Sequence, residues 1–121
     1  MPRPRKCRRI CSMPQTDGFE PIRENAALSS EVVLNIDEYE VIRLIDFEKL
    51  TQEQCAVQMA VSRTTITGIY EAARYKLADA LIHGKKLIIG GGEFMLCEHN
   101  GECCGKGCRH NEKLYHGGRR I

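Results

Sequence analysis

Apolar residues recur at spacings of three and four in three successive segments, a pattern typical of amphipathic helices. The first segment, "IDEYEVIRLIDFEKL", predicts a helix over residues 37–49 that begins at the capping residue Asp37 and has acidic residues in its first turn. Its predicted core-facing stripe has five members: Tyr39, Val41, Ile42, Leu44 and Ile45.

The second segment, "LTQEQCAVQMA", follows almost at once. Thr51 and Gln54 have the spacing of a capping box, which predicts a helix over residues 52–59. Three residues form its expected buried side: Cys55, Ala56 and Met59. We expect Cys55 to act as a small core hydrophobe and not as a metal ligand.

The third segment, "VSRTTITGIY", has the composition of a β-strand but the periodicity of a helix. β-Branched and aromatic residues favour strands, yet an alternating pattern gives no clean division into an apolar and a polar face. A helix that begins after the capping residue Ser62 instead places the apolar residues within an arc of roughly 120°. These residues are Ile66, Ile69, Ala73, Leu77, Ala80 and Leu81. We therefore predict a helix over residues 63–82, ended by Gly84.

The rest of the chain shows weaker patterns, which divide it into three parts. Residues 1–30 predict a mobile basic arm and an extended segment, in which "RICSMP" can form a short strand. Residues 31–92 hold the three helices and a short strand over Leu87–Ile89, and residues 93–121 form a tail rich in Cys and His. The predicted fold class is mainly α.

Helices 52–59 and 63–82, joined by a short turn, predict a helix-turn-helix. Ala56 is small enough for the two helices to cross closely, and Val61 supplies an aliphatic side chain that the turn can bury. Ala60 stands where Gly is usual, so it must accept any left-handed conformation that the turn requires. The alternative is a plain helical hairpin with a polar outer face.

In a helix-turn-helix, the second helix inserts its exposed N-terminal face into the major groove of DNA. Five residues are predicted to lie at the groove: Arg63, Thr64, Thr65, Thr67 and Gly68. Threonine methyl groups can contact thymine, Arg63 can bond guanine or phosphate, and Glu71 can accept a hydrogen bond from cytosine. Arg74 and Tyr75 are expected to lie closer to the phosphates.

The net charge of +2 is distributed unevenly along the chain. Residues 1–9 hold five basic side chains and no acidic one. Four of them are predicted to follow a minor groove or phosphates: Arg3, Arg5, Lys6 and Arg8. The alternative is a solubilising end without a partner. No segment has the apolar run of a membrane span or a secretory signal, which predicts a cytoplasmic protein without membrane contact.

Six potential metal ligands lie within fourteen residues of the tail: Cys97, His99, Cys103, Cys104, Cys108 and His110. Thiolates with imidazoles suit zinc, and thiolates alone suit an iron–sulfur cluster. The paired C-x2-C spacing of zinc ribbons is missing, so a flexible tail of reducible thiols is the alternative. Cys7 and Cys11 can supply further ligands or form a separate pair.

Four features occur in a fixed order: the arm "MPRPRKCRRI", the first helix, the "VSR" that begins the recognition helix, and "HGKKLIIGG" after it. With them, residues 1–92 resemble a small uncharacterised prokaryotic family predicted to bind DNA through a helix-turn-helix similar to the fourth region of sigma factors. The resemblance implies a transcriptional regulator or an accessory DNA-binding protein. Some relatives carry a domain similar to those that handle iron–molybdenum cofactor, and nothing in this sequence matches that domain.

Together these features predict a sequence-specific DNA-binding protein that acts on double-stranded DNA as a homodimeric transcriptional regulator. The homodimer is inferred from the small core and from the paired half-sites that such proteins use. Two alternatives remain: a metal- or thiol-redox-responsive protein that works through the tail, and a protein–protein adaptor. No nucleophile–base arrangement or phosphate-binding loop is visible, so we expect no enzymatic activity.

Overall fold

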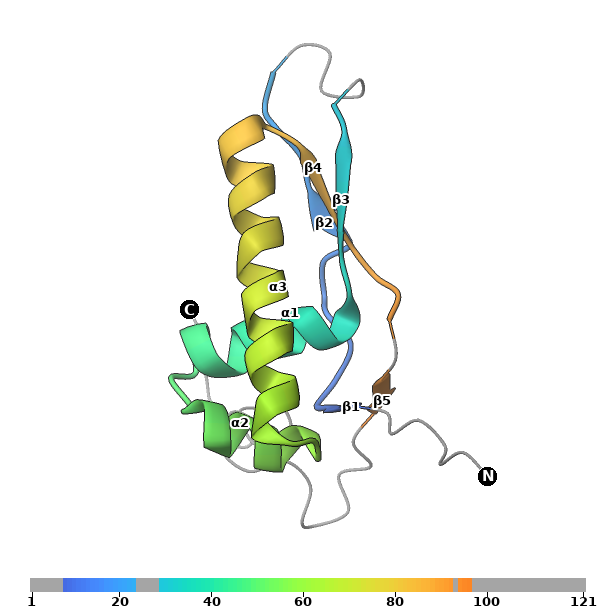
Figure 1. Cartoon of the computed structure of the whole chain (residues 1–121). Helices are drawn as coiled ribbons and strands as arrows, with labels where there is room; N and C mark the ends of the chain where they lie inside the picture. Colours follow the sequence, from blue (N-terminus) through green and yellow to red (C-terminus); the bar gives the residue numbers. More distant parts are fainter. Residues whose placement is uncertain (1–7, 24–28, 93, 97–121) are drawn as a thin grey trace, which may run out of the picture.

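The computed structural model describes residues 8–23, 29–92 and 94–96, which form an α/β domain (Figure 1). The helices are α1 (Ile36–Ile42), α2 (Gln52–Met59) and α3 (Arg63–His83), and the π-helix η2 (Arg43–Phe47) continues α1. The strands are β1 (Arg8–Ile10), β2 (Gly18–Phe19), β3 (Glu31–Leu34), β4 (Lys86–Ile89) and β5 (Phe94–Leu96). The prediction of a mainly α fold underestimated the strands.

Strands β2, β4 and β3 form a mixed sheet in which central β4 pairs antiparallel with β2 and parallel with β3. The strand predicted over Leu87–Ile89 is confirmed as β4, while β1 and β5 form a separate parallel pair. Both β1 and β2 lie within residues 1–30: β1 overlaps the short strand predicted for "RICSMP", whereas β2 lies where the sequence predicted extended chain. Strands of two or three residues are too short to show an alternating pattern, and their partners lie far along the chain.

Helix α1 begins and ends differently from the predicted helix over residues 37–49. Asn35 is the N-cap in place of Asp37, and the Glu38 carboxylate accepts a hydrogen bond from the Asn35 backbone amide at 2.8 Å. At the other end, the Glu48 amide donates to the Arg43 carbonyl at 2.9 Å, an i to i−5 bond that makes this turn a π-helix. The last turn of this helical segment is therefore wider than an α-helical turn. The segment stops before Lys49, which has a positive φ of 69°.

The apolar stripe predicted for α1 is divided between two core clusters. Ile45 packs against the larger cluster, which joins α1, α2 and α3, while Tyr39 and Ile42 pack against a smaller cluster between α3 and the three-stranded sheet. All three are only partly buried, and Val41 and Leu44 are fully buried. Because α1 is covered on two sides, its buried surface is wider than one stripe.

Helices α2 and α3 begin at the predicted N-caps, Thr51 and Ser62. The Thr51 hydroxyl accepts from the Gln54 amide at 3.0 Å and the Gln54 side chain accepts from the Thr51 amide at 2.9 Å, which completes the capping box. The Ser62 hydroxyl accepts from the Thr65 amide at 3.1 Å and caps α3. Ala60 adopts the left-handed conformation with φ 62° and ψ 42°, which directs the chain from one helix into the next.

The Ala60→Gly substitution is expected to raise the free energy of unfolding by about 1 kcal/mol. A Cβ in the left-handed region costs on the order of 1–2 kcal/mol, and the greater freedom of Gly in the unfolded chain offsets part of that gain. Urea unfolding of the two proteins measures the difference. A loss of stability in the glycine variant would show that the Ala60 methyl group contributes more through packing than it costs through strain.

Helix α3 buries Ile66, Ile69 and Ala73, and the predicted helix over residues 63–82 is confirmed with one further residue, His83. Leu81, which was predicted to be buried, is 80% exposed. It lies about 80° around the helix axis from Ala73, at the edge of the apolar arc, so the sheet does not cover it. None of the helices in the described ranges has both the length and the apolar character needed to cross a membrane.

Candidate nucleic-acid interface

The outer face of the first half of α3 is open to solvent. Five of the residues predicted to contact DNA are exposed on this side of α3, Tyr75 lying just beyond its midpoint: Arg63, Thr64, Gly68, Glu71 and Tyr75. This half of α3 is supported from behind by α1 and α2, and the three-stranded sheet lies beside the second half (Figure 1). The structure therefore places these five residues on one rigid helix with a free outward face.

Thr65 and Thr67 differ from their neighbours because their hydroxyl groups have partners within the chain. The Thr67 hydroxyl donates to the Gln52 side chain at 2.6 Å and lies 3.1 Å from the Arg63 carbonyl. The Thr65 hydroxyl lies 3.0 Å from the Ser62 hydroxyl. The Thr67–Gln52 bond ties the first turn of α2 to α3, whereas the Thr65 hydroxyl stays beside the N-cap of its own helix.

Arg74 is exposed, but its guanidinium is held by a neighbouring tyrosine. It donates to the Tyr70 hydroxyl at 3.0 Å and stacks over the ring with its central carbon 5.2 Å from the ring centroid. The Tyr70 hydroxyl in turn donates to Asp46 at 2.7 Å, and this bond is the main reason that the pKa of Tyr70 is raised. The chain thus fixes Arg74 beside η2 with its positive charge still facing solvent.

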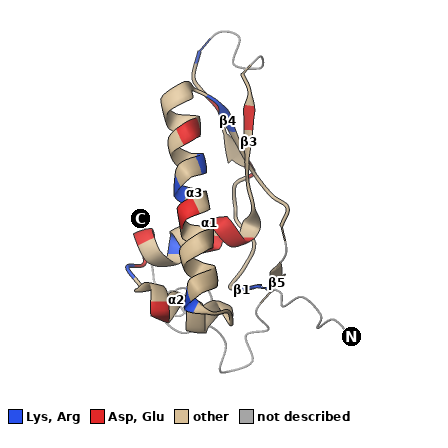
Figure 2. Ribbon diagram, in the orientation of Figure 1, with Lys and Arg blue, Asp and Glu red and all other residues tan. Residues whose placement is uncertain are grey.

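The charges of α3 are mixed and not uniformly basic. Figure 2 shows basic and acidic residues along its length, and Lys76 makes an ion pair with Glu38 of α1 at 2.8 Å. Within the described residues, no ion pair is formed by Arg63 or by Glu71. The exposed face therefore presents Arg63 near its start and Glu71 further along, with the charge of Arg74 held beside Tyr70.

Of the predicted basic arm, only the end lies within the described residues. Arg8 makes an ion pair with Asp37 at 3.6 Å, and Arg9 donates from Nε to the Gln58 carbonyl at 2.8 Å. Burial raises the pKa of Asp37, although Arg8 and the Glu38 amide act in the opposite direction. Arg3, Arg5 and Lys6 lie outside the described residues. The start of β1 is therefore fastened to α1 and to the end of α2.

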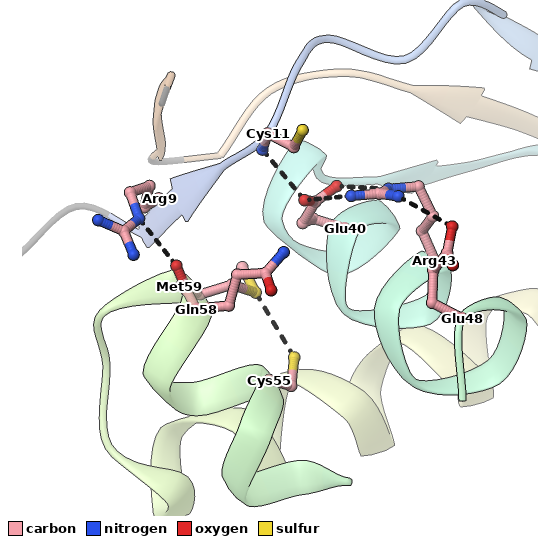
Figure 3. A network of polar contacts seen from close by, with 8 residues as sticks. All are labelled: Arg9, Cys11, Glu40, Arg43, Glu48, Cys55, Gln58 and Met59. Carbon is pink, nitrogen blue, oxygen red and sulfur yellow. Dashed lines mark hydrogen bonds and ion pairs between the residues drawn. The ribbon is translucent and has the colours of Figure 1, made fainter. Parts of the chain in front are cut away.

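Sequence reasoning missed a buried polar network behind the interface (Figure 3). Arg43 donates from Nε to Glu40 Oε1 at 3.1 Å and from Nη2 to Glu40 Oε2 at 2.9 Å, and from Nη1 to Glu48 at 3.4 Å. Glu40 Oε2 also accepts from the Cys11 backbone amide at 3.1 Å. The available signal was a Glu–Arg pair at i and i+3 whose neighbours in the sequence, Val41, Ile42 and Leu44, are apolar. The network fastens the end of β1 to α1.

Cys55 lies in the centre of the larger core cluster and is fully buried. Its thiol lies 3.8 Å from the Met59 sulfur, as expected for a small core hydrophobe. Burial is the main cause that raises the pKa of Cys55 to about 12, and the nearby Glu40 charge acts in the same direction. The thiol therefore stays protonated over the physiological range.

We expect Cys55 to remain unmodified when the folded protein is treated with iodoacetamide at pH 8. The thiolate is the reactive species, and a pKa of about 12 leaves only about one thiol in ten thousand ionised at that pH. Mass spectrometry of peptides after a short treatment, with and without urea, makes the measurement. Rapid modification without urea would contradict the buried position.

The predicted metal ligands of the tail lie outside the described residues: Cys97, His99, Cys103, Cys104, Cys108 and His110. Cys7 lies outside them as well, whereas Cys11 is described and buried. Within residues 8–23, 29–92 and 94–96, the structure contains no group of three or more His, Cys, Asp or Glu side chains able to hold a metal ion.

Residues 1–97 match the family described as "Protein of unknown function DUF134". A UPF0251 protein of Desulfitobacterium hafniense strain Y51 is 52% identical over 108 residues, which cover 89% of this chain and 86% of that protein. A UPF0251 protein of Caldicellulosiruptor saccharolyticus is 47% identical over 108 residues, covering 88% of this chain and 76% of that protein. No solved structure matches the chain. The UPF0251 proteins are similar to this chain along most of its length, and the family match covers residues 1–97. The chain therefore belongs to the DUF134 family.

Proposed function

We propose that this chain is a sequence-specific DNA-binding protein that regulates transcription in the cytoplasm. In this proposal α2, the turn and α3 form a helix-turn-helix similar to the fourth region of sigma factors, and the first half of α3 enters the major groove. The observation that carries the proposal is Gly68, which lies in the middle of the open face of α3.

Glycine in the interior of a helix costs about 0.5–1 kcal/mol relative to alanine. Nothing inside the described chain explains this cost, because a Cβ added at Gly68 would meet no atom within 4 Å. The close approach of a partner to the helix backbone would explain it, and a base edge in the major groove makes such an approach. Gly68 therefore favours an external partner at this face.

The neighbours of Gly68 supply the chemistry for base contact. Arg63 has donors for guanine or phosphate, Thr64 has a methyl group for thymine, and Glu71 can accept from cytosine. Arg74 and Tyr75 lie further along α3, where phosphates would run. Thr65 and Thr67, whose hydroxyl groups are bonded within the chain, would offer mainly their methyl groups.

We include the basic arm in the proposed interface. Arg3, Arg5 and Lys6 would contact phosphates or a minor groove, and each such contact makes binding weaker as salt rises. Arg8 would contribute less, because its guanidinium faces Asp37 and lies in a strand. Arg9, in the described end of the arm, donates to the Gln58 carbonyl near the end of α2.

Selection of genomic fragments by the untagged chain, followed by binding titrations at several salt concentrations, tests the proposed function. We expect one recurring sequence among the bound fragments, and an affinity for it at least a hundredfold above that for a scrambled duplex at the same salt. A protein–protein adaptor would show no duplex binding even at low salt. Binding with no preference among sequences would contradict base contact by α3.

We propose further that the protein acts as a homodimer through the far end of α3. Leu81 and Ile82 are 80% and 72% exposed, on a helix whose other end carries the proposed DNA contacts. Arg23 donates to the Gly84 carbonyl at 3.2 Å, which brings the fully exposed Ile22 to the same end. A second copy that covers these apolar side chains would leave both DNA-binding ends free for two half-sites.

The Leu81→Glu substitution is expected to shift the protein to a monomer, with little loss of folding stability because the side chain is exposed. Light scattering during size-exclusion chromatography measures the mass, and Val57→Glu, at an exposed apolar position of α2, is the matched control. The proposed dimer interface fails if wild-type protein is monomeric at tens of micromolar, or if both variants dissociate equally.

A further inference from the structure

The side chain of Gln52, at the first residue of α2, is fixed against the flank of α3. Its carboxamide lies 2.6 Å from the Thr67 hydroxyl, although the two residues are 15 positions apart in the sequence. That distance is typical of an O–H···O hydrogen bond and short for an N–H···O bond, so the amide oxygen accepts the hydroxyl proton. The orientation of the Gln52 side chain is therefore set by α3 and not by its own helix.

The amide nitrogen of Gln52 is left with two N–H groups to donate. Within the part of the chain that the structure describes, the bond from Thr67 is the one hydrogen bond of this side chain. The nitrogen of a carboxamide lies about 2.2 Å from its oxygen, which places Nε2 within about 5 Å of the Thr67 hydroxyl. Gln52 is only half-buried, so an acceptor outside the chain can reach these donors.

Gln52 lies where the wall of the major groove would be if α3 entered it. The groove is about 12 Å wide and a helix with its side chains is about 10–12 Å across, so phosphates would follow both flanks of α3. Thr67 lies one turn from Arg63 and one turn from Glu71, on the flank of α3 that meets the start of α2. A phosphate oxygen accepts hydrogen bonds and has no proton to donate, which suits an amide nitrogen that can only donate.

We propose that Gln52 donates from Nε2 to a phosphate of the DNA backbone, and that Thr67 is the positioning residue that holds it there. This inference rests on the proposed function, in which α3 lies in the major groove. Such a contact fixes the register of the protein on the duplex and carries no base preference of its own. The carboxylate of the next residue, Glu53, is exposed about 100° further around α2 and reduces the strength of this contact.

Duplexes that each carry one methylphosphonate, in which a methyl group replaces a charged phosphate oxygen, test the contact. Wild-type protein should lose affinity for the selected DNA sequence at one linkage to which Gln52→Ala is insensitive. Gln52→Ala should bind the unmodified duplex about tenfold more weakly, as expected for a lost hydrogen bond to a charged group. Its salt dependence should be that of wild-type protein, because a neutral side chain releases no counterion, whereas Arg74→Ala should reduce the salt dependence.

Thr67→Val tests the positioning role, because valine keeps the shape of the side chain and lacks the hydroxyl. We expect affinity to fall about threefold in the wild-type background and not to fall further in the Gln52→Ala background, where there is no amide to orient. A separate loss in the Gln52→Ala background would mean that the hydroxyl acts without Gln52, and would overturn the positioning role.

Gln52→Glu and Gln54→Glu form a matched pair, since they add the same charge about 200° apart around α2. The Gln54 side chain accepts from the Thr51 amide, and glutamate keeps this capping bond. Gln52→Glu should weaken DNA binding at least about tenfold and Gln54→Glu less than about threefold, because only position 52 faces the phosphate. Far-ultraviolet circular dichroism checks that each variant is folded.

The outcomes separate this inference from the proposed function. If wild-type protein binds no duplex at all, both are wrong. If wild-type protein binds the selected duplex, and folded Gln52→Ala binds it with the same affinity and the same sensitivity to every methylphosphonate, the phosphate contact alone is overturned. Equal losses in Gln52→Glu and Gln54→Glu would likewise overturn it, because general repulsion between the added charge and DNA would then explain both.

Discussion

Glu40→Ala is expected to lower the free energy of unfolding by about 3–5 kcal/mol, the range found when one partner of a buried ion pair is removed. Glu40 is 1% exposed, makes two hydrogen bonds with Arg43 and accepts one from the Cys11 amide. Without it, the Arg43 guanidinium would remain buried with Glu48 at 3.4 Å as its ion-pair partner. Urea unfolding followed by circular dichroism gives the difference.

Two control variants separate the buried charge from the loss of side-chain atoms. Replacement of both partners, Glu40→Leu with Arg43→Leu, should recover more than half of the loss, because no unpaired charge stays buried. The part not recovered would reflect the Cys11 amide, which loses its acceptor. Glu71→Ala, at an exposed carboxylate, should change stability by less than about 0.5 kcal/mol. A similarly small effect of Glu40→Ala would contradict the network.

Arg63→Ala combined with Thr64→Ala is expected to weaken binding to the selected DNA sequence by roughly tenfold to a hundredfold or more, since a good base contact contributes about 1–3 kcal/mol. Both side chains are exposed, and the Ser62 cap and the Arg63 carbonyl are retained, so the unfolding midpoint should change little. Fluorescence anisotropy with the selected and the scrambled duplex measures the two affinities.

Lys49→Ala is the matched control for the loss of one positive charge. Lys49 is exposed between η2 and α2, and it belongs to neither the proposed DNA contacts nor the proposed dimer interface. It should leave the preference for the selected duplex unchanged. Equal losses in the two variants would mean that charge alone, and not contact at the start of α3, explains the binding. Unfolding of the double variant would place Arg63 and Thr64 in the core.

The features that sequence reasoning predicted well are local. Thr51 and Ser62 cap helices because their hydroxyl groups reach amides three residues ahead, so their spacing alone indicates where α2 and α3 begin. Gly84 ends α3 in the left-handed conformation for an equally local reason. Periodicity of the isoleucines was likewise sufficient to identify "VSRTTITGIY" as helix instead of strand.

The features that were missed depend on partners distant in the sequence. β2 exists because β4 supplies its hydrogen bonds, and two residues are too few to indicate such a partner. β1 overlaps the short strand predicted for "RICSMP", but its parallel pairing with β5 was not predicted. Glu40 and Arg43 look like a solvated surface pair until the Cys11 amide and Glu48 join them in the buried network. Leu81 is exposed because it lies at the edge of the apolar arc of α3, where the sheet does not reach. The sequence does not indicate how far the sheet extends over the helix.

In the candidate site, too, the local features were predicted and the contacts between distant residues were not. The helix, its first residue and its outward face were predictable, whereas the partners of Thr65 and Thr67 required the structure. Those two hydroxyl groups are bonded within the chain, which leaves Arg63, Thr64 and Gly68 as the exposed residues nearest the start of α3. The proposed DNA contact therefore depends on fewer side chains than the sequence suggested.

Site-specific cross-linking tests the central proposal most directly. Glu71→p-benzoylphenylalanine introduces a photoreactive side chain on the exposed face of α3 without filling the space at Gly68, and Val33→p-benzoylphenylalanine introduces one at a half-exposed position of β3 as the control. On irradiation with the selected duplex, we predict a covalent adduct to a base from position 71 and none from position 33. Equal cross-linking from both positions, or none from position 71 while the duplex stays bound, would contradict insertion of α3 into the groove.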